Sequence, residues 1–506
     1  MVTKSARFFN LMLSHLRAHR SANIFLTGCR GLDSLRYVDF ALVREMIVMK
    51  FGGTSVEDAA AINRVAAIVK GRLDRAPVVV VSAMARVTDA LLHIAHAARE
   101  RRFEEASASI NALLERHLGV ARELLYSFAD PSLIDEVDAA TKALVAELEN
   151  LVRSVATLGE LTPRSQDAII SFGERLSSRL VAAAFVVRGI SAELVDSRDF
   201  IITDDRFTAA TPDMTEIDIR AREVLKPLLA QHRVPVAQGF IGATKNGTTT
   251  TIGRGGSDYS AALIGAALQA ESIEIWTDVD GLMTADPRVV PAARRIRVIS
   301  FAEASELSFF GAKVLHPSTV LPAVEKGIPV HIYNTRNPAC EGTLIVAEPR
   351  ASKNIIKSIA FKRGVTIVNV TSTRMLLAYG FLRTIFDVFE RHETSVDVVT
   401  TSEVSVSMTL DDPDRLDAIK RDLSGIGDVT VEGQKAIVCV VGDNLKFTPG
   451  VAARLFKSIE STNVNMISQG ASEINVTFVI DDREIERVVR LLHDEFFTDC
   501  DPAVFA

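Results

Sequence analysis

Short apolar runs alternate with longer helical segments from Ile47 onward. Runs such as Val78 to Val81 are apolar without alternation, which is typical of strands buried on both faces of a parallel sheet. The pattern therefore predicts an α/β fold in which helical layers cover a mostly parallel sheet. A breaker-poor segment between about 90 and 160 predicts a helical layer or insertion. Strands are predicted at 47–51, 77–82, 192–196, 234–238, 249–252, 273–277 and 329–333.

The sequence changes character at 346–356, which is polar, contains Pro349 and lacks periodicity, so we predict a linker there. Beyond it the chain repeats itself. The segment from Gly380, GFLRTIFDVFERHETSVDVVTTSEVSVSMTLDD, aligns with GVAARLFKSIESTNVNMISQGASEINVTFVIDD from Gly450. Each unit of about seventy residues predicts a β-α-β-β-α-β plan. Two such units can pair and bury each other's strand edges.

Composition narrows the classes of function. Of 506 residues, 48% are hydrophobic and 24% are charged, which is a globular balance and argues against wholesale disorder. The length sets a prior of about three domains. A net charge of −7 leaves no positive excess for phosphate backbones, so we expect no nucleic-acid partner and favour small molecules. No apolar run reaches about eighteen residues, so we expect no membrane-spanning helix.

Cysteine spacing and the N-terminal segment bear on the cellular compartment. The four cysteines include no C-x-x-C pair, which fits neither a disulfide framework nor a zinc site, so a reducing, cytoplasmic environment is expected. Residues 1–45 are basic and lack the apolar core of a secretory signal. We interpret them as a disordered extension or the product of a mis-set start codon. A transit peptide is an alternative, which Asp33, Asp39 and Glu45 weaken.

The first motif with chemical potential is KFGGTSV, Lys50 to Val56, at the end of the first predicted strand. Its adjacent glycines permit close backbone approach, and a following helix N-terminus supplies free N–H groups, so a phosphate can bind there. Lys50 would add a full positive charge. The motif is neither a P-loop, in which the lysine follows the glycines, nor a dinucleotide fingerprint. The alternative is a tight turn with a solvated lysine.

The second motif is TTTTIGRGGSDYSAAL, Thr248 to Leu263, a strand followed by a glycine loop and an apolar helix. Arg254 can clamp a carboxylate through two parallel N–H donors, while Ser257 or Asp258 can cap the helix. A plain turn is the alternative. We favour a ligand loop because three glycines around an arginine are costly to fold unless a ligand uses them.

Three further motifs are weaker when taken singly. In SFGERLSSRL, Glu174 can accept an ammonium group, or it can simply stabilise its helix through the dipole. In IWTDVDGLMTADPRVVP, clustered carboxylates at a strand end suit ribose or hydrated magnesium, or they form a solvated turn. In ELSFFGAKVLHP, Lys313 can reach a polyphosphate as a point charge, or it is an ordinary surface lysine.

Together the five motifs resemble the aspartate kinases of the amino-acid kinase family, over about 47 to 500. The resemblance implies an amino-acid kinase fold at 46–345, with a mostly parallel sheet between helical layers, and a monofunctional enzyme. It implies that MgATP phosphorylates the side-chain carboxylate of L-aspartate, giving 4-phospho-L-aspartate for lysine, threonine and methionine biosynthesis. By the same resemblance, Lys50 and Asp258 are catalytic, and the substrate is held by Thr88 (in SAMARVTDAL), Glu174, Arg254 and Ser257. ATP would contact Gly52, Gly53, Thr54, Ser55, Thr277, Asp278, Arg288, Lys313 and Val314.

The tandem units resemble ACT domains, α+β ferredoxin-like sensors of small ligands, expected at 357–430 and 431–506. MLLAYGFL and SVDVVTTSE are similar to the lysine-responsive version, which implies inhibition by lysine, with threonine as the alternative effector. A Gly-started helix exposes N–H groups to an effector carboxylate, and Asp397 and Glu403 can attract an amine. The alternative is a purely structural pairing module. The implied effector contacts are Met375, Gly380, Phe381, Leu382, Asp397, Ser402 and Glu403.

Two rival functions remain open at this point. A kinase of another small carboxylate would share the fold but lack the set formed by Thr88, Glu174 and Arg254. A non-catalytic amino-acid sensor derived from a kinase is the second rival, and the retention of Lys50, Arg254 and Asp258 argues against it. The paired ACT edges and the family resemblance lead us to expect a homodimer formed through the ACT domains.

Overall fold

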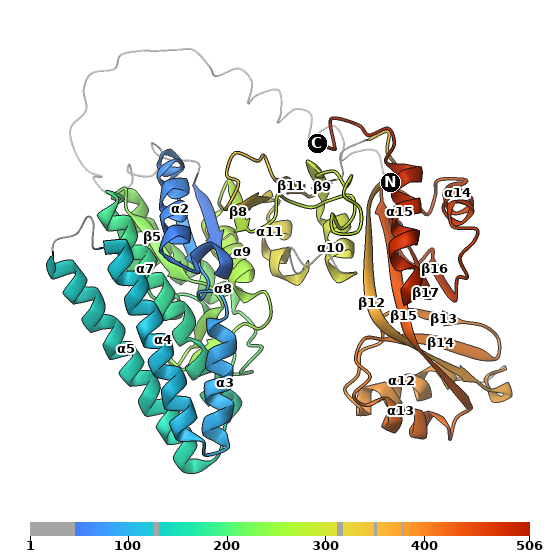
Figure 1. Cartoon of the computed structure of the whole chain (residues 1–506), viewed down its shortest axis with the longest axis horizontal. Coiled ribbons are helices and arrows are strands. Elements are labelled where there is room, and N and C mark those ends of the chain that lie inside the picture. The colour runs from blue at the N-terminus through green and yellow to red at the C-terminus, as the bar shows by residue number, and fades with distance from the viewer. Residues whose placement is uncertain (1–45, 126–130, 311–316, 349–351, 377–378) are drawn as a thin grey trace, which may run out of the picture. The chain divides into compact units, whose positions relative to one another are not determined.

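The computed structural model describes residues 46–125, 131–310, 317–348, 352–376 and 379–506. The predicted N-terminal extension, Lys313 and Val314 lie outside these residues. The first half is built on an eight-stranded sheet, in which only the β10–β11 pair is antiparallel (Figure 1). In spatial order its strands are β3 (Ala192–Val195), β5 (Val234–Gln238), β2 (Val78–Val81), β1 (Ile47–Phe51), β8 (Ser272–Thr277), β10 (Val330–Asn334), β11 (Thr343–Val346) and β9 (Val298–Ser300).

This sheet confirms the α/β prediction. Six of the predicted strands match β1, β2, β3, β5, β8 and β10 to within about one residue at each end. Methods of assigning secondary structure differ by as much. The seventh, β7 (Thr249–Thr251), lies instead in a separate three-stranded sheet with β4 (Ile202–Thr203) and β6 (Ile241–Thr244). The two short strands β4 and β6 had no separate prediction.

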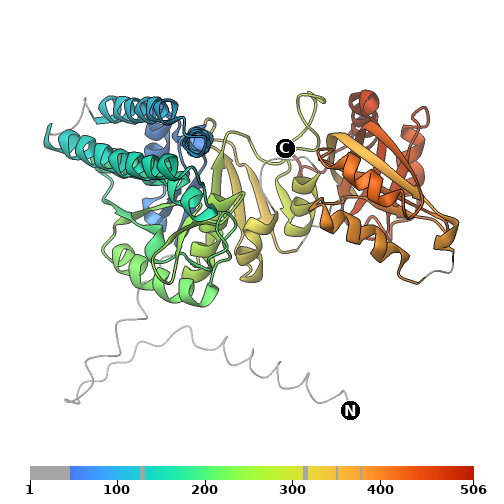
Figure 2. The same ribbon diagram turned by 90° about the horizontal axis from the view of Figure 1, so that it is seen from below.

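Helices cover both faces of the large sheet because alternate residues of each strand point to opposite faces. Ile47, Met49 and Phe51 of β1 pack in one core with α2 and α7, whereas Val48 packs in the other core with α8 and α9. The predicted helical layer is confirmed as α3, α4 and α5, which run side by side (Figure 2). The helices of this half are α2 (Ala59–Lys70), α3 (Val87–Arg99), α4 (Phe103–Leu125), α5 (Pro131–Leu158), α6 (Pro163–Ile170), α7 (Phe172–Val187), α8 (Met214–Ala230), α9 (Gly256–Leu268), α10 (Phe301–Phe309) and α11 (Leu321–Glu325).

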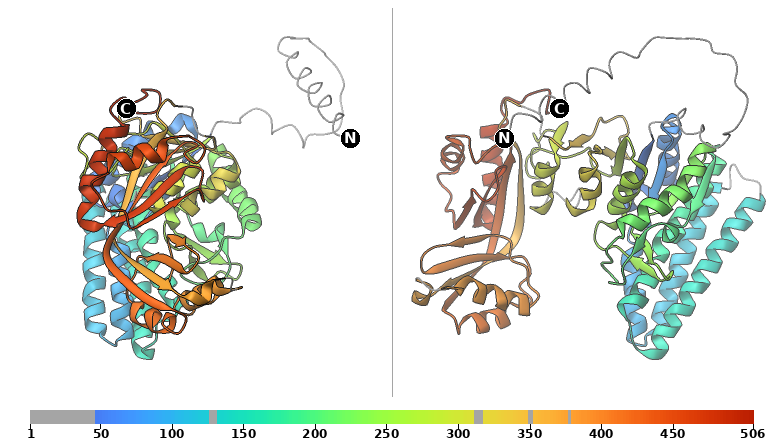
Figure 3. Two further views of the ribbon diagram at one scale, coloured as in Figure 1. Left: turned by 90° about the vertical axis from the view of Figure 1, so that its right-hand side faces the viewer. Right: turned by 180° about the vertical axis from the view of Figure 1, so that it is seen from behind.

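The second half is an antiparallel sheet of six strands with helices α12 (Phe381–Arg391), α13 (Leu416–Leu423), α14 (Val451–Ser458) and α15 (Ile485–Phe496). Two long strands, β12 and β15, pair along their whole lengths at its centre (Figure 3). The predicted boundary between 430 and 431 falls inside β15, and the domain limits stay predictions. In spatial order the strands are β13 (Val399–Thr401), β14 (Ser405–Leu410), β12 (Ile356–Thr371), β15 (Asp428–Gly442), β17 (Asn475–Asp481) and β16 (Met466–Gln469).

Buried polar contacts join the start of β12 to the first half. The Lys357 ammonium lies 2.9 Å from a carboxylate oxygen of Glu303 in α10, and both side chains are almost completely excluded from solvent. Two residues further on, the backbone N–H of Ile359 donates to the carbonyl of Thr284 at 2.8 Å. The Thr284 hydroxyl in turn lies 3.0 Å from Nε2 of His493 in α15. The loop that follows β8 is therefore held directly by the second sheet and its last helix.

Two further observations concern membrane-spanning helices and cysteines. Within the described ranges, every helix is too short or too polar to cross a membrane. Cys340, Cys439 and Cys500 are free thiols.

Candidate active site

Lys50 occupies the carboxyl end of β1, on the face of the sheet that α9 covers. The residue is 9% exposed, and its ammonium nitrogen lies 2.7 Å from a carboxylate oxygen of Asp258 in the first turn of α9. The chain turns directly after the strand, and the N–H of Gly52 donates to the carbonyl of Trp276 on β8 at 3.1 Å. A side chain at Gly53 would come within 2.9 Å of the Ala83 carbonyl, so glycine is required there.

The glycine loop before α9 places Asp258 against Lys50. Gly253 and Gly255 have φ of +78° and +71°, a left-handed conformation that side chains disfavour. Gly255 is the N-cap of α9, and no side chain caps this helix. The expectation that Ser257 or Asp258 caps it is therefore wrong, because the Asp258 carboxylate turns to the lysine instead.

Glu174 lies in the first turn of α7 and is 3% exposed. One carboxylate oxygen accepts a hydrogen bond from the N–H of Ala83 at 3.1 Å, and the other is buried without a hydrogen-bond partner in the described structure. Burial raises the pKa of Glu174 to about 8, although the Ala83 N–H favours the ionised form. A buried carboxylate in this state gains a partner and loses its proton when a cation enters beside it.

A cavity of about 400 Å³ brings these groups together. Its wall contains the predicted catalytic and substrate-binding residues from four separate segments of the chain, so the structure places Lys50 and Arg254 on one pocket. The predicted residues that line it are Lys50, Gly53, Thr88, Glu174, Arg254, Ser257 and Asp258. Lysine and arginine supply positive charge, and Glu174 supplies the one strongly buried carboxyl group that could receive an amine.

The cavity also contains residues that sequence reasoning did not select. Ser82, Arg86, Asp89 and Phe240 line it. Arg86 is exposed and has φ of +66°, an uncommon conformation for a residue other than glycine. It lies in SAMARVTDAL, from which only Thr88 was chosen, so the two charged residues of that segment, Arg86 and Asp89, were the available signal.

Of the predicted ATP-binding residues, Gly52, Thr277 and Asp278 lie at or just beyond the carboxyl ends of β1 and β8. Because β1 pairs with β8 in parallel and Phe51 lies opposite Trp276, Gly52 directly follows β1 beside Thr277, the last residue of β8. Ser55 is buried and shares a hydrogen bond of 2.7 Å with the Thr335 hydroxyl, so its side chain does not face the cavity. The Thr277 hydroxyl donates to Asp278 at 3.3 Å. Arg288 is 88% exposed and is held by a two-point contact with Asp286.

The described residues contain no group of three or more histidine, cysteine or acidic side chains able to hold a metal ion. A magnesium ion that arrives with nucleotide phosphates does not need such a group, because Mg²⁺ keeps most of its water and needs one or two protein carboxylates at most. Asp258 and Asp278 are single carboxylates near the ends of the strands and can serve in this way.

The predicted effector residues fall into two groups in the second half. The chain just before Met375 lies beside the turn that contains Ser402 and Glu403, because the N–H of Ser372 donates to the carbonyl of Val404, and Gly380 is the N-cap of α12. Asp397 lies five residues before Ser402, at the other end of the β13–β14 hairpin, and its carboxylate pairs with Lys362 at 3.2 Å. Burial, reinforced by nearby Asp411, raises the pKa of Asp397 to about 6. Within one chain the predicted effector residues therefore do not converge on one point.

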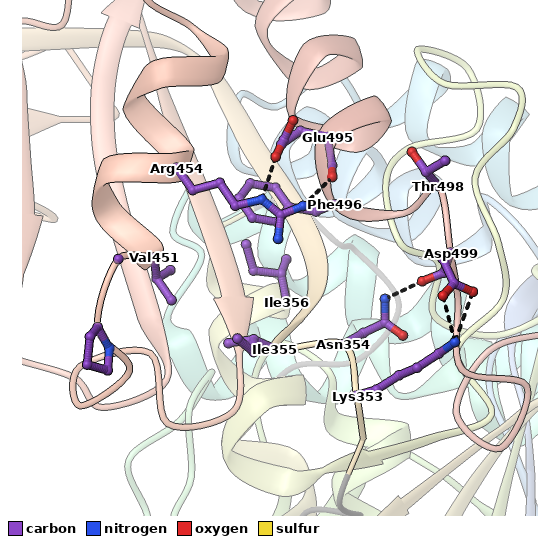
Figure 4. Close-up of a pocket in the computed structure, with 12 residues that line it drawn as sticks. Lys353, Asn354, Ile355, Ile356, Val451, Arg454, Glu495, Phe496, Thr498 and Asp499 are labelled. Carbon is purple, nitrogen blue, oxygen red and sulfur yellow. Dashed lines mark hydrogen bonds and ion pairs between the residues drawn. The ribbon is translucent and has the colours of Figure 1, made fainter.

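A second cavity of about 470 Å³ lies between the start of β12, the start of α14 and the end of α15 (Figure 4). Its charged side chains pair with one another: Arg454 contacts Glu495, and Lys353 lies 2.8 Å from Asp499. None of the predicted catalytic, ATP-binding or effector residues is among the residues that line it.

Comparison with known proteins extends over nearly the whole described chain. The model of the amino acid kinase family matches residues 45–334, and an ACT domain model matches residues 438–496. The chain is 39% identical to lysine-sensitive aspartokinase 3 of Escherichia coli (strain K12), over 90% of this chain and 99% of that protein. It is 38% identical to the chloroplastic aspartokinase 1 of Arabidopsis thaliana, over 89% of this chain and 80% of that protein.

Solved structures agree with this relationship. The fold is similar to that of E. coli aspartokinase III in complex with aspartate and ADP, with a TM-score of 0.76 and 37% identity over 90% of this chain and 100% of that one. The same enzyme in complex with lysine and aspartate gives a TM-score of 0.77 and 38% identity over the same shares. By sequence and by fold, the chain belongs to the amino acid kinase family and, within it, to the aspartokinases.

Proposed function

We propose that this protein is an aspartate kinase, which transfers the γ-phosphoryl group of ATP to the side-chain carboxylate of L-aspartate. The observation that carries the proposal is the single cavity lined by Lys50, Glu174, Arg254 and Asp258. Its charges are complementary to an amino acid with two carboxylates and one amine. The solved relative with aspartate and ADP supports the same substrates.

Aspartate binding follows from the charges of the wall. Glu174 receives the substrate ammonium, because its second oxygen is buried and has no hydrogen-bond partner in the described structure. Arg254 holds a carboxylate through two parallel N–H donors, and the hydroxyl groups of Thr88 and Ser257 complete the polar wall. The site discriminates strongly against acceptors that lack the amine or the carboxylate, because Glu174 or Arg254 would then be left unpaired.

The transfer step requires alignment and charge neutralisation. An aspartate carboxylate is already a competent nucleophile and needs no general base. Lys50 offsets the repulsion between this carboxylate and the incoming phosphate, while Asp258 fixes the position of the Lys50 ammonium. Asp258, predicted as catalytic, thus acts as a positioning residue that holds the lysine at the reacting centre, and not as a proton acceptor.

ATP occupies the neighbouring strand ends. The turn at Gly52 and Gly53, with Thr54 and Ser55, forms the phosphate side, and Thr277, Asp278, Arg288, Lys313 and Val314 form the rest of the nucleotide site. Asp258 or Asp278 would hold a magnesium ion that arrives with ATP, and this ion would neutralise charge developing on the phosphates. Support comes from the parallel pairing that sets Gly52 beside Trp276 and from the ADP complex of the solved relative.

Regulation is the second part of the proposal. We infer that lysine binds the ACT units at 357–430 and 431–506 and favours a less active arrangement, in a cytoplasmic homodimer joined through these units. The separation of Asp397 from Ser402 within one chain supports an effector site that a second copy completes. The lysine complex of the solved relative supports the choice of effector. The enzyme would then begin lysine, threonine and methionine biosynthesis under feedback control.

An ADP-release assay coupled to NADH oxidation tests the proposal directly. We expect turnover with aspartate, much less with glutamate, and inhibition by lysine but not by arginine, a cation of similar length. Turnover only with another acceptor would identify a different carboxylate kinase. Binding of lysine without any ATP turnover would identify a non-catalytic sensor.

A further inference from the structure

Asp167 is a buried carboxylate that the mechanism above does not use. It lies in α6, has no exposed surface, and faces segments far away in sequence. One oxygen accepts from the backbone N–H groups of Thr208 and Thr251, each at 2.9 Å, and the other accepts from the Thr251 hydroxyl at 2.7 Å. Burial raises the pKa of this carboxyl group, so its place in the interior has an energetic cost that these three hydrogen bonds offset.

Both ends of this hydrogen-bond network lead into the active site. Thr251 ends β7, three residues before Arg254, so Asp167 fixes the strand from which the glycine loop departs. On the other side, only Ser171 separates α6 from α7, which carries Glu174. The backbone carbonyl of Asp167 accepts from the Ser171 N–H, and the carbonyl of Ser171 accepts from the Arg175 N–H, so the helical ladder continues across that junction.

The remaining hydrogen bond of Asp167, from the Thr208 N–H, holds a segment that packs against the glycine loop. Thr208 has φ of +73°, and its N–H is held by Asp167. The carbonyl of Thr208 and the Cα of Ala209 lie 3.6 Å from the position that a Cβ on Gly253 would take. The segment anchored by Asp167 therefore packs directly against the residue that precedes Arg254.

We propose that Asp167 is a positioning residue that sets the distance between Arg254 and Glu174, and thereby the affinity for the amino-acid substrate. This inference rests on the proposed function, in which these two side chains hold the opposite charges of aspartate. They come from different elements. The Asp167 side chain is hydrogen-bonded to the end of β7 and to the segment that packs against Gly253, while its helix α6 leads through Ser171 into α7, which carries Glu174. A shift of about 1 Å between two such groups is enough to weaken a two-point interaction severely.

The test compares variants by direct aspartate binding, measured by calorimetry, and by KM for aspartate and for ATP. Asp167→Ala removes all three hydrogen bonds, and we expect aspartate affinity to fall about tenfold or more while KM for ATP changes little. Asp167→Asn should restore most of the affinity, because its amide oxygen can accept both N–H groups and its NH₂ can donate to the Thr251 hydroxyl.

A matched pair on β7 covers the case in which Asp167→Ala does not fold. Thr251→Val deletes one bond to Asp167. Thr250→Val, at the preceding residue of β7, deletes the buried 2.7 Å bond to Thr203 of β4 and no bond to Asp167. We expect similar melting temperatures for the two variants but weaker aspartate binding, by about threefold, only for Thr251→Val. Equal aspartate binding in both would overturn the positioning role. Failure of the unmodified protein to bind aspartate at all would instead overturn the proposed function.

Discussion

The ammonium nitrogen of Lys50 lies 2.7 Å from a carboxylate oxygen of Asp258, and both side chains are almost excluded from solvent. This pair joins the end of the central strand to the first turn of α9. It holds one positive charge at the edge of the cavity, where in the proposed reaction a phosphate and a carboxylate approach each other. The charge is therefore in place before either substrate binds, which is the condition for strong electrostatic catalysis.

Lys50→Ala should lower kcat by at least about a hundredfold, the usual scale for removing one preorganised charge at a reacting centre. Initial rates at saturating aspartate and ATP measure this. Lys226→Ala, which removes an exposed lysine from α8, serves as the control and should leave kcat within about twofold. An unchanged kcat in Lys50→Ala would remove this lysine from the catalytic group.

Arg254→Ala should chiefly raise KM for aspartate, by about tenfold or more, because a carboxylate clamp acts in the ground state and the transition state alike. Arg254→Lys keeps the charge but loses the second parallel donor, so we expect an intermediate KM. Steady-state kinetics with each substrate varied in turn give the measurement. A rise confined to KM for ATP would contradict the assignment of Arg254 to aspartate.

Aspartate binding should release a proton from Glu174. Burial raises its pKa from about 4.5 to about 8, so at pH 7 the free protein holds this carboxyl group mostly protonated. The substrate ammonium stabilises the ionised form and lowers that pKa, so about one proton is released on binding. Aspartate affinity accordingly rises with pH up to about 8 and then levels off.

Calorimetry in buffers of different ionisation enthalpy measures the proton count. Glu174→Gln is the matched variant, since its amide oxygen can still accept the Ala83 N–H but cannot titrate. We expect it to bind aspartate weakly and with no proton release that depends on this site. Proton uptake by the unmodified protein at pH 7 would show that the assigned state of Glu174 is wrong.

Lys357→Met should destabilise the protein by about 3–5 kcal/mol, the usual cost of leaving one member of a buried ion pair unpaired. Glu303 is buried beside it and also forms the capping box of α10 with Ser300. The double variant Lys357→Met/Glu303→Gln should recover part of the loss, because the neutral amide keeps an acceptor for Ser300 and no longer buries a lone charge. Urea unfolding followed by the fluorescence of Trp276 reports on the adjoining sheet, and additive effects of the two substitutions would contradict the pairing.

Sequence periodicity predicted the large sheet well because its central strands are short, apolar and bounded by clear breakers. The small sheet escaped because β4 has two residues and β6 is hard to separate from β5, which ends only three residues earlier. The long strands β12 and β15 were also not foreseen. An alignment of the repeats treats the two units as separate, whereas β12 and β15 each continue through both units.

The candidate site was predictable where glycines and charges cluster within one motif, as in KFGGTSV and GRGGSD. Its internal contacts were not, because they depend on packing between segments distant in sequence. Asp258 looked like a helix cap by position, and only the approach of β1 to α9 turns it toward Lys50. Asp167 sits in PRSQDAII, where it resembles an ordinary exposed helix residue, and its partners lie 41 and 84 residues away.

Strands β12 and β15 share one ladder that runs from Ile356 opposite Gly442 to Thr371 opposite Asp428. Each of these two strands forms part of both repeats, so neither repeat contains a complete sheet by itself. A gene fragment encoding only one of them would yield a chain with an uncovered edge and half a core, prone to aggregation. Recombination could therefore transfer this sensor to another enzyme only as an undivided pair, so loss or gain of feedback control should occur in a single evolutionary step.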